Sequence, residues 1–357
     1  MSSIPYDRRA QTTLKYLARV FGQGASQDTV IDDAVSQLFD GWGHRSEREN
    51  GNNEPSGAPY EYSLVLGPED VELRVFFRPQ APSGRSTPMD SWSQGWHTLQ
   101  QLSATGTAHL DRAETLTDLF RPEHPQASLG MCIGASLGTN GISGTKVYFD
   151  GVAQGRDRIT GVTKDALARL GYGSAFEWLR SNDPRDVTSL MFSLDLLESP
   201  SARVKLYSSI TETTSSELEA RLVGLPGYEH GAASAFLAAL TQGRPGKLPD
   251  SGVRPHLCWS LTDESILHPS DVTFYYPFRQ EVPGIKEARE ALEGSMPPRI
   301  HDQVTQLLRD MESYSDSVLL NPFHWAATKL KTGSHTVTAY FSAASIDPVA
   351  EQLGEKL

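Results

Sequence analysis

Cationic and phenolic side chains recur at alternating positions in several stretches of the chain. The fullest example is Arg203-Val-Lys205-Leu-Tyr207, and Lys146-Val-Tyr148 is a shortened copy. In a β-strand, residues i, i+2 and i+4 share one face, so these polar groups point the same way while the valine and leucine face a hydrophobic layer. A face that repeatedly combines cations with tyrosine indicates the lining of an anion-binding cavity. Related strand-like stretches carry Arg74, Thr273, Tyr275 and Tyr340.

Each of these residues has a plainer explanation when it is taken alone. Lys146 and Tyr148 are typical of a solvated strand face, and Glu61 is typical of a surface carboxylate. Arg203 and Lys205 are less ordinary, because like charges two residues apart on one face repel each other unless an anion or an acid joins them. The functional interpretation therefore depends on the whole ordered set rather than on any one member.

The composition indicates a soluble globular protein with a substantial core, since 38% of the residues are hydrophobic and 9% are aromatic. No apolar run approaches the roughly 20 residues that span a bilayer. The N-terminal stretch lacks the apolar segment of an export signal, and we expect a cytoplasmic protein. Cys132 and Cys258 are too few for a disulfide framework, so we expect two buried thiols. A net charge of −12 argues against general nucleic-acid binding but allows a small anionic substrate in a cationic cavity.

Five pairs of strand-like runs follow one another, each joined by a connector rich in Gly, Pro, Ser or Asp, as hairpin loops require. The pairs are residues 60–66 with 72–78, 129–137 with 145–150, 190–197 with 202–208, 256–262 with 272–277, and 325–331 with 335–342. Ten antiparallel strands that close on themselves leave no free edge and can enclose a ligand-sized lumen. We therefore predict a single domain over residues 1–357, of the α/β class, with a ring of helices around a ten-stranded barrel.

Helical patterns fill the gaps between these pairs. Residues 10–39 and 90–120 have helical character, and Thr163-Lys-Asp165 is expected to open a helix over residues 166–180. Thr214-x-x-Glu217 has the form of a capping box. One apolar stripe at helical spacing is formed by Ile300, Val304, Leu307, Leu308 and Met311.

The order of these motifs resembles the dimethylallyltryptophan synthase family of aromatic prenyltransferases, especially its compact bacterial indole prenyltransferases. Gly57-Ala-Pro-Tyr-Glu61 matches a G-x-P-x-E motif. An arginine strand, K-x-Y, R-x-K-x-Y, a Tyr-aromatic-Pro strand and a late tyrosine strand follow it in the family's order. Each motif alone is weak, but six in order, distributed over the five predicted hairpins, cover nearly the whole chain. The resemblance implies the prenyltransferase (ABBA) barrel, which agrees with the five hairpins.

The resemblance also implies an activity, namely transfer of a dimethylallyl group from dimethylallyl diphosphate to the indole of tryptophan or a small tryptophan-derived metabolite. The new bond would form by electrophilic aromatic substitution or N-alkylation, with release of diphosphate. Glu61 matches the family's glutamate that hydrogen-bonds the indole N–H, and Thr273 and Trp325 stand at acceptor-pocket positions that other members fill with Gln and Tyr. The implied diphosphate ligands are Arg74, Lys146, Arg203 and Lys205, and the implied cation shield is Tyr148, Tyr207, Tyr275 and Tyr340.

The chemistry of such a transfer fits these residue types. Diphosphate carries about three negative charges, which preorganised cations stabilise as the allylic C–O bond breaks. Tyrosine ring faces stabilise an allyl cation by about 0.5–2 kcal/mol each. No D-D-x-x-D run is present, because Asp32-Asp33 is followed by Ala-Val-Ser, and no histidine pair has zinc-site spacing. We therefore expect an enzyme without a metal cofactor.

Two alternatives remain open at the level of sequence. A phenol or naphthol prenyltransferase would use the same fold, with Glu61 contacting a hydroxyl group. A non-catalytic barrel that carries an isoprenoid diphosphate would need no acceptor-side carboxylate. The strand that begins at Met131 contains no lysine, which argues against indole C4 as the target. The position of attachment, the donor length, the exact indole acceptor and the oligomeric state, monomer or weak homo-oligomer, stay open.

Overall fold

The structure is a computed structural model of the 357-residue chain. It describes residues 4–22, 25–46, 57–67, 70–182, 190–210, 212, 214–225, 228–240, 254–277, 300–313, 323–330 and 336–353. Two segments that connect predicted strands lie outside these residues. They are residues 332–334, within the fifth predicted pair, and most of residues 242–255, before the fourth.

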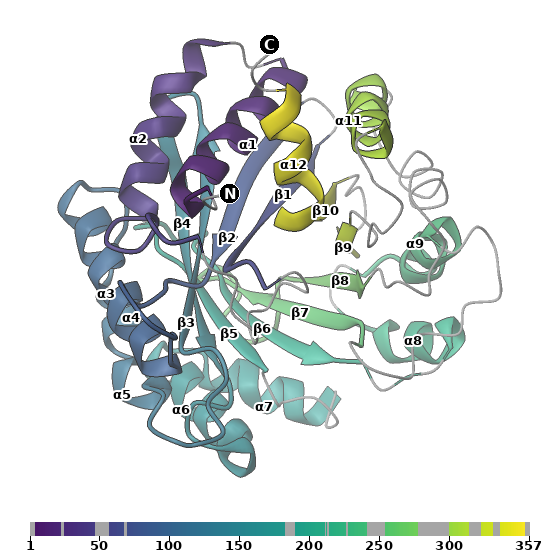
Figure 1. The fold of residues 1–357 in the computed structure, drawn as a ribbon. Helices are drawn as coiled ribbons and strands as arrows, with labels where there is room; N and C mark the ends of the chain where they lie inside the picture. The colour runs from purple at the N-terminus through teal and green to yellow at the C-terminus, as the bar shows by residue number, and fades with distance from the viewer. Residues whose placement is uncertain are drawn as a thin grey trace.

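Ten antiparallel strands form a closed barrel in which every strand pairs with two neighbours (Figure 1). Each predicted hairpin is confirmed as an adjacent antiparallel pair, and the pairing of β1 with β10 closes the ring. The strands are β1 Tyr60–Leu66, β2 Val71–Phe77, β3 Met131–Gly138, β4 Gly141–Asp150, β5 Met191–Asp195, β6 Val204–Ser209, β7 His256–Leu261, β8 Asp271–Pro277, β9 Phe323–Lys329 and β10 Val337–Ser342.

Helices surround this barrel (Figure 1). They are α1 Tyr6–Val20, α2 Asp28–Leu38, α3 Pro88–Ala104, α4 Asp111–Glu114, α5 Thr117–Phe120, α6 Ile159–Arg169, α7 Gly173–Asn182, α8 Ser215–Leu222, α9 Ala232–Leu240, α11 His301–Ser313 and α12 Ala343–Leu353, with 3-10 turns η1 Ala25–Gln27 and η2 Arg156–Arg158. Within the described residues, none of the helices is long and apolar enough to cross a membrane.

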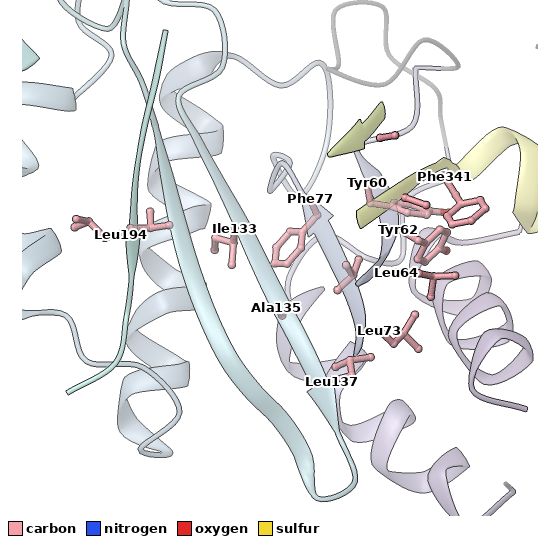
Figure 2. Packing of buried hydrophobic residues seen from close by; sticks show 14 of the residues in the cluster. Tyr60, Tyr62, Leu64, Leu73, Phe77, Ile133, Ala135, Leu137, Leu194 and Phe341 are labelled. Carbon is pink, nitrogen blue, oxygen red and sulfur yellow. The ribbon is translucent and has the colours of Figure 1, made fainter. Parts of the chain in front are cut away.

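The outer face of the barrel is apolar and packs against the helices. The ring of Phe149 on β4 lies 5.0 Å from that of Phe120 on α5 and 5.8 Å from that of Trp92 on α3. Phe274 on β8 contacts Phe236 on α9. Figure 2 shows the same layer elsewhere, with side chains of alternate strand residues gathered between sheet and helices. Because these alternate positions face outward, the residues between them face the lumen.

Some predicted helices differ from the observed ones. The helix predicted from the Thr163 cap is two helices, because α6 begins earlier, at Ile159, and the chain turns at Gly171 with φ +86° before α7. Thr163 lies inside α6 and donates its hydroxyl hydrogen to the Ile159 carbonyl. Residues 10–39 and 90–120 are likewise divided, into α1 and α2 and into α3, α4 and α5.

Other helix predictions are confirmed. The Thr214 hydroxyl accepts from the Glu217 N–H at the start of α8, and the Glu217 carboxylate accepts from the Thr214 N–H. The apolar stripe of α11, with Ile300 just before it, is buried. Cys132 and Cys258 are buried free thiols, as predicted.

The two ends of the described chain pack together on the first strand. Helices α1 and α12, drawn purple and yellow, lie side by side (Figure 1). Asp347 of α12 is buried there and accepts hydrogen bonds from Thr13 of α1 and from Tyr60 and Tyr62 of β1, at 2.8–2.9 Å. This carboxyl lies on the outer side of the barrel, because Tyr60 and Tyr62 belong to the hydrophobic layer beneath the helices (Figure 2).

Candidate active site

The lumen face carries cations and aromatic rings in successive layers. On β4, Lys146 and Tyr148 alternate with the outward-facing Val147 and Phe149, and β6 repeats the arrangement with Lys205 and Tyr207. On β2, Arg74 precedes Phe76 by two residues, and the Phe76 ring lies 5.0 Å from that of Tyr148. A cation layer therefore lies beside an aromatic layer, because successive inward positions on a strand are about 7 Å apart.

The predicted cations are each close to a lumen carboxylate or to another cation. The Arg74 guanidinium donates to both oxygens of Glu72, at 2.9 and 2.7 Å. Arg203 Nε donates to Asp195 Oδ2 at 2.6 Å, and Lys146 Nζ lies 3.9 Å from Asp195 Oδ1. The structure therefore places these predicted cations, on different strands, around shared acids.

Burial and mutual repulsion govern the charge of this cluster. Burial, and then the charges of Arg74 and Lys205, hold the pKa of Lys146 well below its usual value, while Asp195 opposes the shift. Burial also lowers the pKa of Lys205. Burial opposes ionisation of Asp195, yet Lys146 and Arg203 lower its pKa. A cluster that loses stability through like-charge repulsion is suited to binding an anion.

Four tyrosines on alternate strands form an arc in the aromatic layer. The ring centroids of Tyr148 and Tyr207 are 6.1 Å apart, those of Tyr207 and Tyr275 are 5.6 Å apart, and those of Tyr275 and Tyr340 are 5.9 Å apart. Burial raises the pKa of all four phenols, and that of Tyr340 reaches about 12. The rings are therefore neutral near pH 7 and present π-faces to whatever lies among them.

A cavity of about 360 Å³ lies against these rings. All four tyrosines line it, together with Glu61 and Phe76, which pair across β1 and β2. None of the four predicted diphosphate ligands is among its lining residues. The cavity thus lies on the aromatic and Glu61 side of the cation layer.

Trp325, which the sequence assigned to the acceptor pocket, lines the cavity, and its stacking partner His256 was not predicted. The two rings stack with centroids 5.0 Å apart and planes 27° apart. His256 Nδ1 lies 3.3 Å from the Ser209 hydroxyl oxygen, and burial lowers the pKa of its imidazole to about 4. A neutral imidazole therefore faces the acceptor side. Its pairing with Tyr275 across β7 and β8 was the signal that could have revealed it.

The mouth of the cavity adds one cation. Arg156 of η2 is exposed and lines the cavity beside Asp150. The Asp150 carboxylate accepts from the backbone N–H groups of Ser128, Leu129 and Val152, at 2.6–3.0 Å, so its role is to hold this part of the rim. Arg156 lies outside the strands, and no strand alternation could have identified it.

Thr273 faces the lumen but does not line the cavity. It pairs with Cys258 on one side and with Lys329 on the other. Lys329 Nζ lies 3.6 Å from Asp271 Oδ2, which makes Lys329 a further lumen cation that we did not predict. The structure therefore places Thr273 toward the cations, whereas the sequence assigned it to the acceptor pocket. Lys329 shares its alternation with Trp325, so the strand pattern did contain this signal.

Across the described part of the chain, no group of three or more His, Cys, Asp or Glu side chains could hold a metal ion. Three lumen carboxylates, Glu72, Asp195 and Asp271, instead lie next to lysines or arginines.

Several solved structures have the same fold. The prenyltransferase PriB, in a binary complex with product diphosphate, superimposes with a TM-score of 0.82 at 23% identity, over 96% of this chain and 97% of PriB. The 5-dimethylallyltryptophan synthase of Streptomyces coelicolor, in complex with DMASPP and Trp, gives 0.80 at 21% identity over 97% of both chains. The 6-dimethylallyltryptophan synthase of Micromonospora olivasterospora, also with DMASPP and Trp, gives 0.79 at 19% identity, over 96% of this chain and 99% of that one.

A comparison at the level of families gives the same result from sequence. The profile described as tryptophan dimethylallyltransferase matches residues 43–223, about half of the chain. This segment contains Glu61, Arg74 and the strands β3 to β6 that carry most of the cation cluster. The chain belongs to the tryptophan dimethylallyltransferase family.

Proposed function

We propose that this protein transfers a dimethylallyl group from dimethylallyl diphosphate to the indole ring of L-tryptophan or a close derivative, and releases diphosphate. The observation that carries the proposal is the order of layers in the lumen, where an arc of tyrosines lies between a cation cluster and a cavity lined by Glu61. The solved relatives that contain diphosphate, or DMASPP and Trp, support the same pair of substrates.

The cation cluster would bind the diphosphate of the donor. As the allylic C–O bond breaks, both bonding electrons leave with the diphosphate oxygen, and the new negative charge falls beside Arg74, Lys146, Arg203 and Lys205. Arginine can bind two oxygens at once, which fixes the orientation of the leaving group. Preorganised charges of this kind stabilise developing negative charge without reorganising during the reaction.

The tyrosine arc would enclose the allyl cation. Neutral rings stabilise it with their π-faces and keep water away from it, so that the indole ring is the nucleophile within reach. An indole carbon or nitrogen then gives two electrons to the allyl terminus, and the ring loses one proton to complete the substitution.

Glu61 would act on the acceptor. It lines the cavity and lies close enough to Tyr340 for its charge to raise the pKa of that phenol. A carboxylate at this place can accept a hydrogen bond from the indole N–H and stabilise positive charge on the ring. A carrier of isoprenoid diphosphate would need no such group, so the position of Glu61 favours a transferase over a carrier.

Arg156 would set which end of the acceptor faces out of the cavity. Glu61 repels a carboxylate, whereas Arg156 at the mouth attracts one. An amino-acid acceptor would therefore place its ring toward Glu61 and its carboxylate toward Arg156. We further propose that residues 1–357 act as one cytoplasmic domain and that the reaction needs no metal ion.

The test is incubation of the purified protein with L-tryptophan and dimethylallyl diphosphate in the presence of EDTA, with mass spectrometry to detect addition of C5H8. A product establishes the transfer and its independence of metal. A parallel reaction with a dihydroxynaphthalene separates the indole acceptor from a phenolic one. Tight diphosphate binding without any product from either acceptor would favour the carrier instead.

A further inference from the structure

The other three predicted diphosphate ligands lie close enough to Lys146 to lower its proton affinity. The ammonium of Lys146 is influenced by Arg74 from β2, by Lys205 from β6 and by Arg203 just before β6. On β3, the residue paired with Lys146 is Gly134, which brings no charge. Such a cluster needs a counter-charge before any anion arrives, or its buried lysine gives up its proton.

Asp195 lies where that counter-charge is needed. It ends β5, the strand between β4 and β6, and only 4% of its surface is exposed. It pairs directly with Lys146 across β4 and β5, and its N–H donates to the Arg203 carbonyl at 2.9 Å. The pairing of β5 with β4 and β6 therefore fixes the carboxyl between two cations that are 57 residues apart in sequence, at 146 and 203.

The two carboxylate oxygens are used differently. Oδ2 accepts the 2.6 Å hydrogen bond from Arg203 Nε. Oδ1 lies 3.9 Å from Lys146 Nζ and accepts no hydrogen bond from any described residue, although it is buried. One oxygen thus orients Arg203, and the other provides negative charge to Lys146.

We propose that Asp195 is a positioning residue of the diphosphate site, whose single carboxylate bridges Lys146 and Arg203, keeping Lys146 charged and Arg203 in place until the donor binds. This inference rests on the proposed function in one respect, that the cluster holds the donor's diphosphate. Nothing in the family match or the sequence motifs assigns Asp195 a role.

The consequence is a specific pattern of kinetics. Among the described residues, the carboxylates near Lys146 are Glu72 on β2, which pairs with Arg74, and Asp195 on the adjacent β5. Without Asp195, Lys146 would lose its proton at lower pH, and the donor would meet an incomplete set of cations. Once bound, the diphosphate itself supplies negative charge and restores the proton. The loss should therefore appear in kcat/KM for the donor and much less in kcat at saturating donor.

The experiment compares the wild type with Asp195→Asn over about pH 5.5–9.5. On the alkaline side of the pH profile, kcat/KM for dimethylallyl diphosphate falls as Lys146 loses its proton, and we call this fall the alkaline limb. In the variant, we expect the limb to occur at a pH lower by about 1–3 units, while kcat at saturating donor changes only a few-fold. Adding Lys146→Arg to Asp195→Asn should abolish this downward shift, because arginine stays protonated throughout this range, and a limb that remains belongs to Lys205, whose pKa is also lowered by burial. Asp118→Asn is the control, since it removes a carboxylate that pairs with Arg169 on the outer helices and should leave the limb in place.

Calorimetry with inorganic diphosphate provides a second readout. At a pH between the two limbs, Asp195→Asn should take up about one more proton per diphosphate than the wild type does. An unchanged limb and unchanged proton uptake in folded Asp195→Asn would overturn the inference. If that variant does not fold, Asp195→Ser, which also removes the charge, must show the same downward shift of the limb, or the inference is wrong. A wild type that neither binds diphosphate nor uses the donor would instead refute the proposed function.

Discussion

Asp347 gives the prediction whose size follows most directly from the structure. Its carboxyl is buried between α12, α1 and β1, and it accepts hydrogen bonds from the hydroxyls of Thr13, Tyr60 and Tyr62. Burial raises its pKa from 3.8 to about 6, although all three hydroxyls and Arg9 act in the opposite direction. The perturbation is Asp347→Asn, which keeps the shape of the group and removes its titration.

The folded state holds this proton more tightly than the unfolded state does. The stabilisation from Asp347 is therefore fully present below the unfolded pKa, near 4, and is lost as the pH rises through about 6. A difference of about two pKa units corresponds to about 3 kcal/mol over the whole range. Between about pH 5 and pH 8, the stabilisation lost corresponds to about one pKa unit, or about 1.4 kcal/mol.

Urea unfolding at these two pH values measures the effect. The free energy of unfolding of the wild type should fall by about 1.4 kcal/mol more than that of Asp347→Asn, because other titrating groups contribute equally to both proteins. Any pH-independent cost of fitting the amide cancels in this difference. Tyr60→Phe removes a hydroxyl that lowers the pKa of Asp347, so its loss of stability should extend to higher pH. Equal pH dependence in the wild type and Asp347→Asn would refute the reasoning.

Three further predictions concern the cavity. Glu61→Gln should reduce turnover by about a hundredfold or more, as for loss of an acid–base group, while diphosphate binding by calorimetry stays near the wild-type value; unchanged turnover would remove Glu61 from the mechanism. Tyr275 lies within the arc and should tolerate Phe, which keeps the ring. Tyr275→Leu should slow transfer by about 2–30-fold and raise the ratio of dimethylallyl alcohol to prenylated product, which chromatography measures. Equal ratios in the wild type and Tyr275→Leu would contradict cation shielding. Arg156→Gln should raise KM for L-tryptophan by about tenfold and leave KM for tryptamine, which lacks the carboxylate, unchanged; a parallel rise for both would show that Arg156 does not bind a carboxylate.

The strands were predictable because alternation is a local property. A strand with one face toward helices and one toward a polar lumen must alternate, and every hairpin could be found from that pattern alone. The helix boundaries were harder. Nothing in the apolar pattern after Thr163 separates one long helix from two, and the turn at Gly171 was read as part of a helix. The predicted start of the second strand of the second hairpin was late, because glycines that belong to β4 resemble a loop.

The cations and tyrosines of the site were found for the same reason as the strands. Lys146, Tyr148, Lys205 and Tyr207 each lie on a recognisable alternating stretch. Residues outside that pattern were missed. Arg156 comes from a short turn at the mouth, and His256 is the first residue of its strand, where alternation has no preceding residue.

Asp195 was not predicted, because its position beside the cations depends on the register between strands. The sequence of one strand does not contain that information. The like charges of Arg203 and Lys205 already required an acid or an anion on their face, yet nothing near them in sequence identifies which acid it is. The answer depends on the register between strands, since Asp195 opposes Lys146 across β4 and β5 and accepts from Arg203 before β6. A slip of one residue in either pairing would turn this carboxyl into the hydrophobic layer and leave the cations without it. The charge state of the cation cluster is therefore a property of the register between strands, whereas the identity of its cations is a property of each strand.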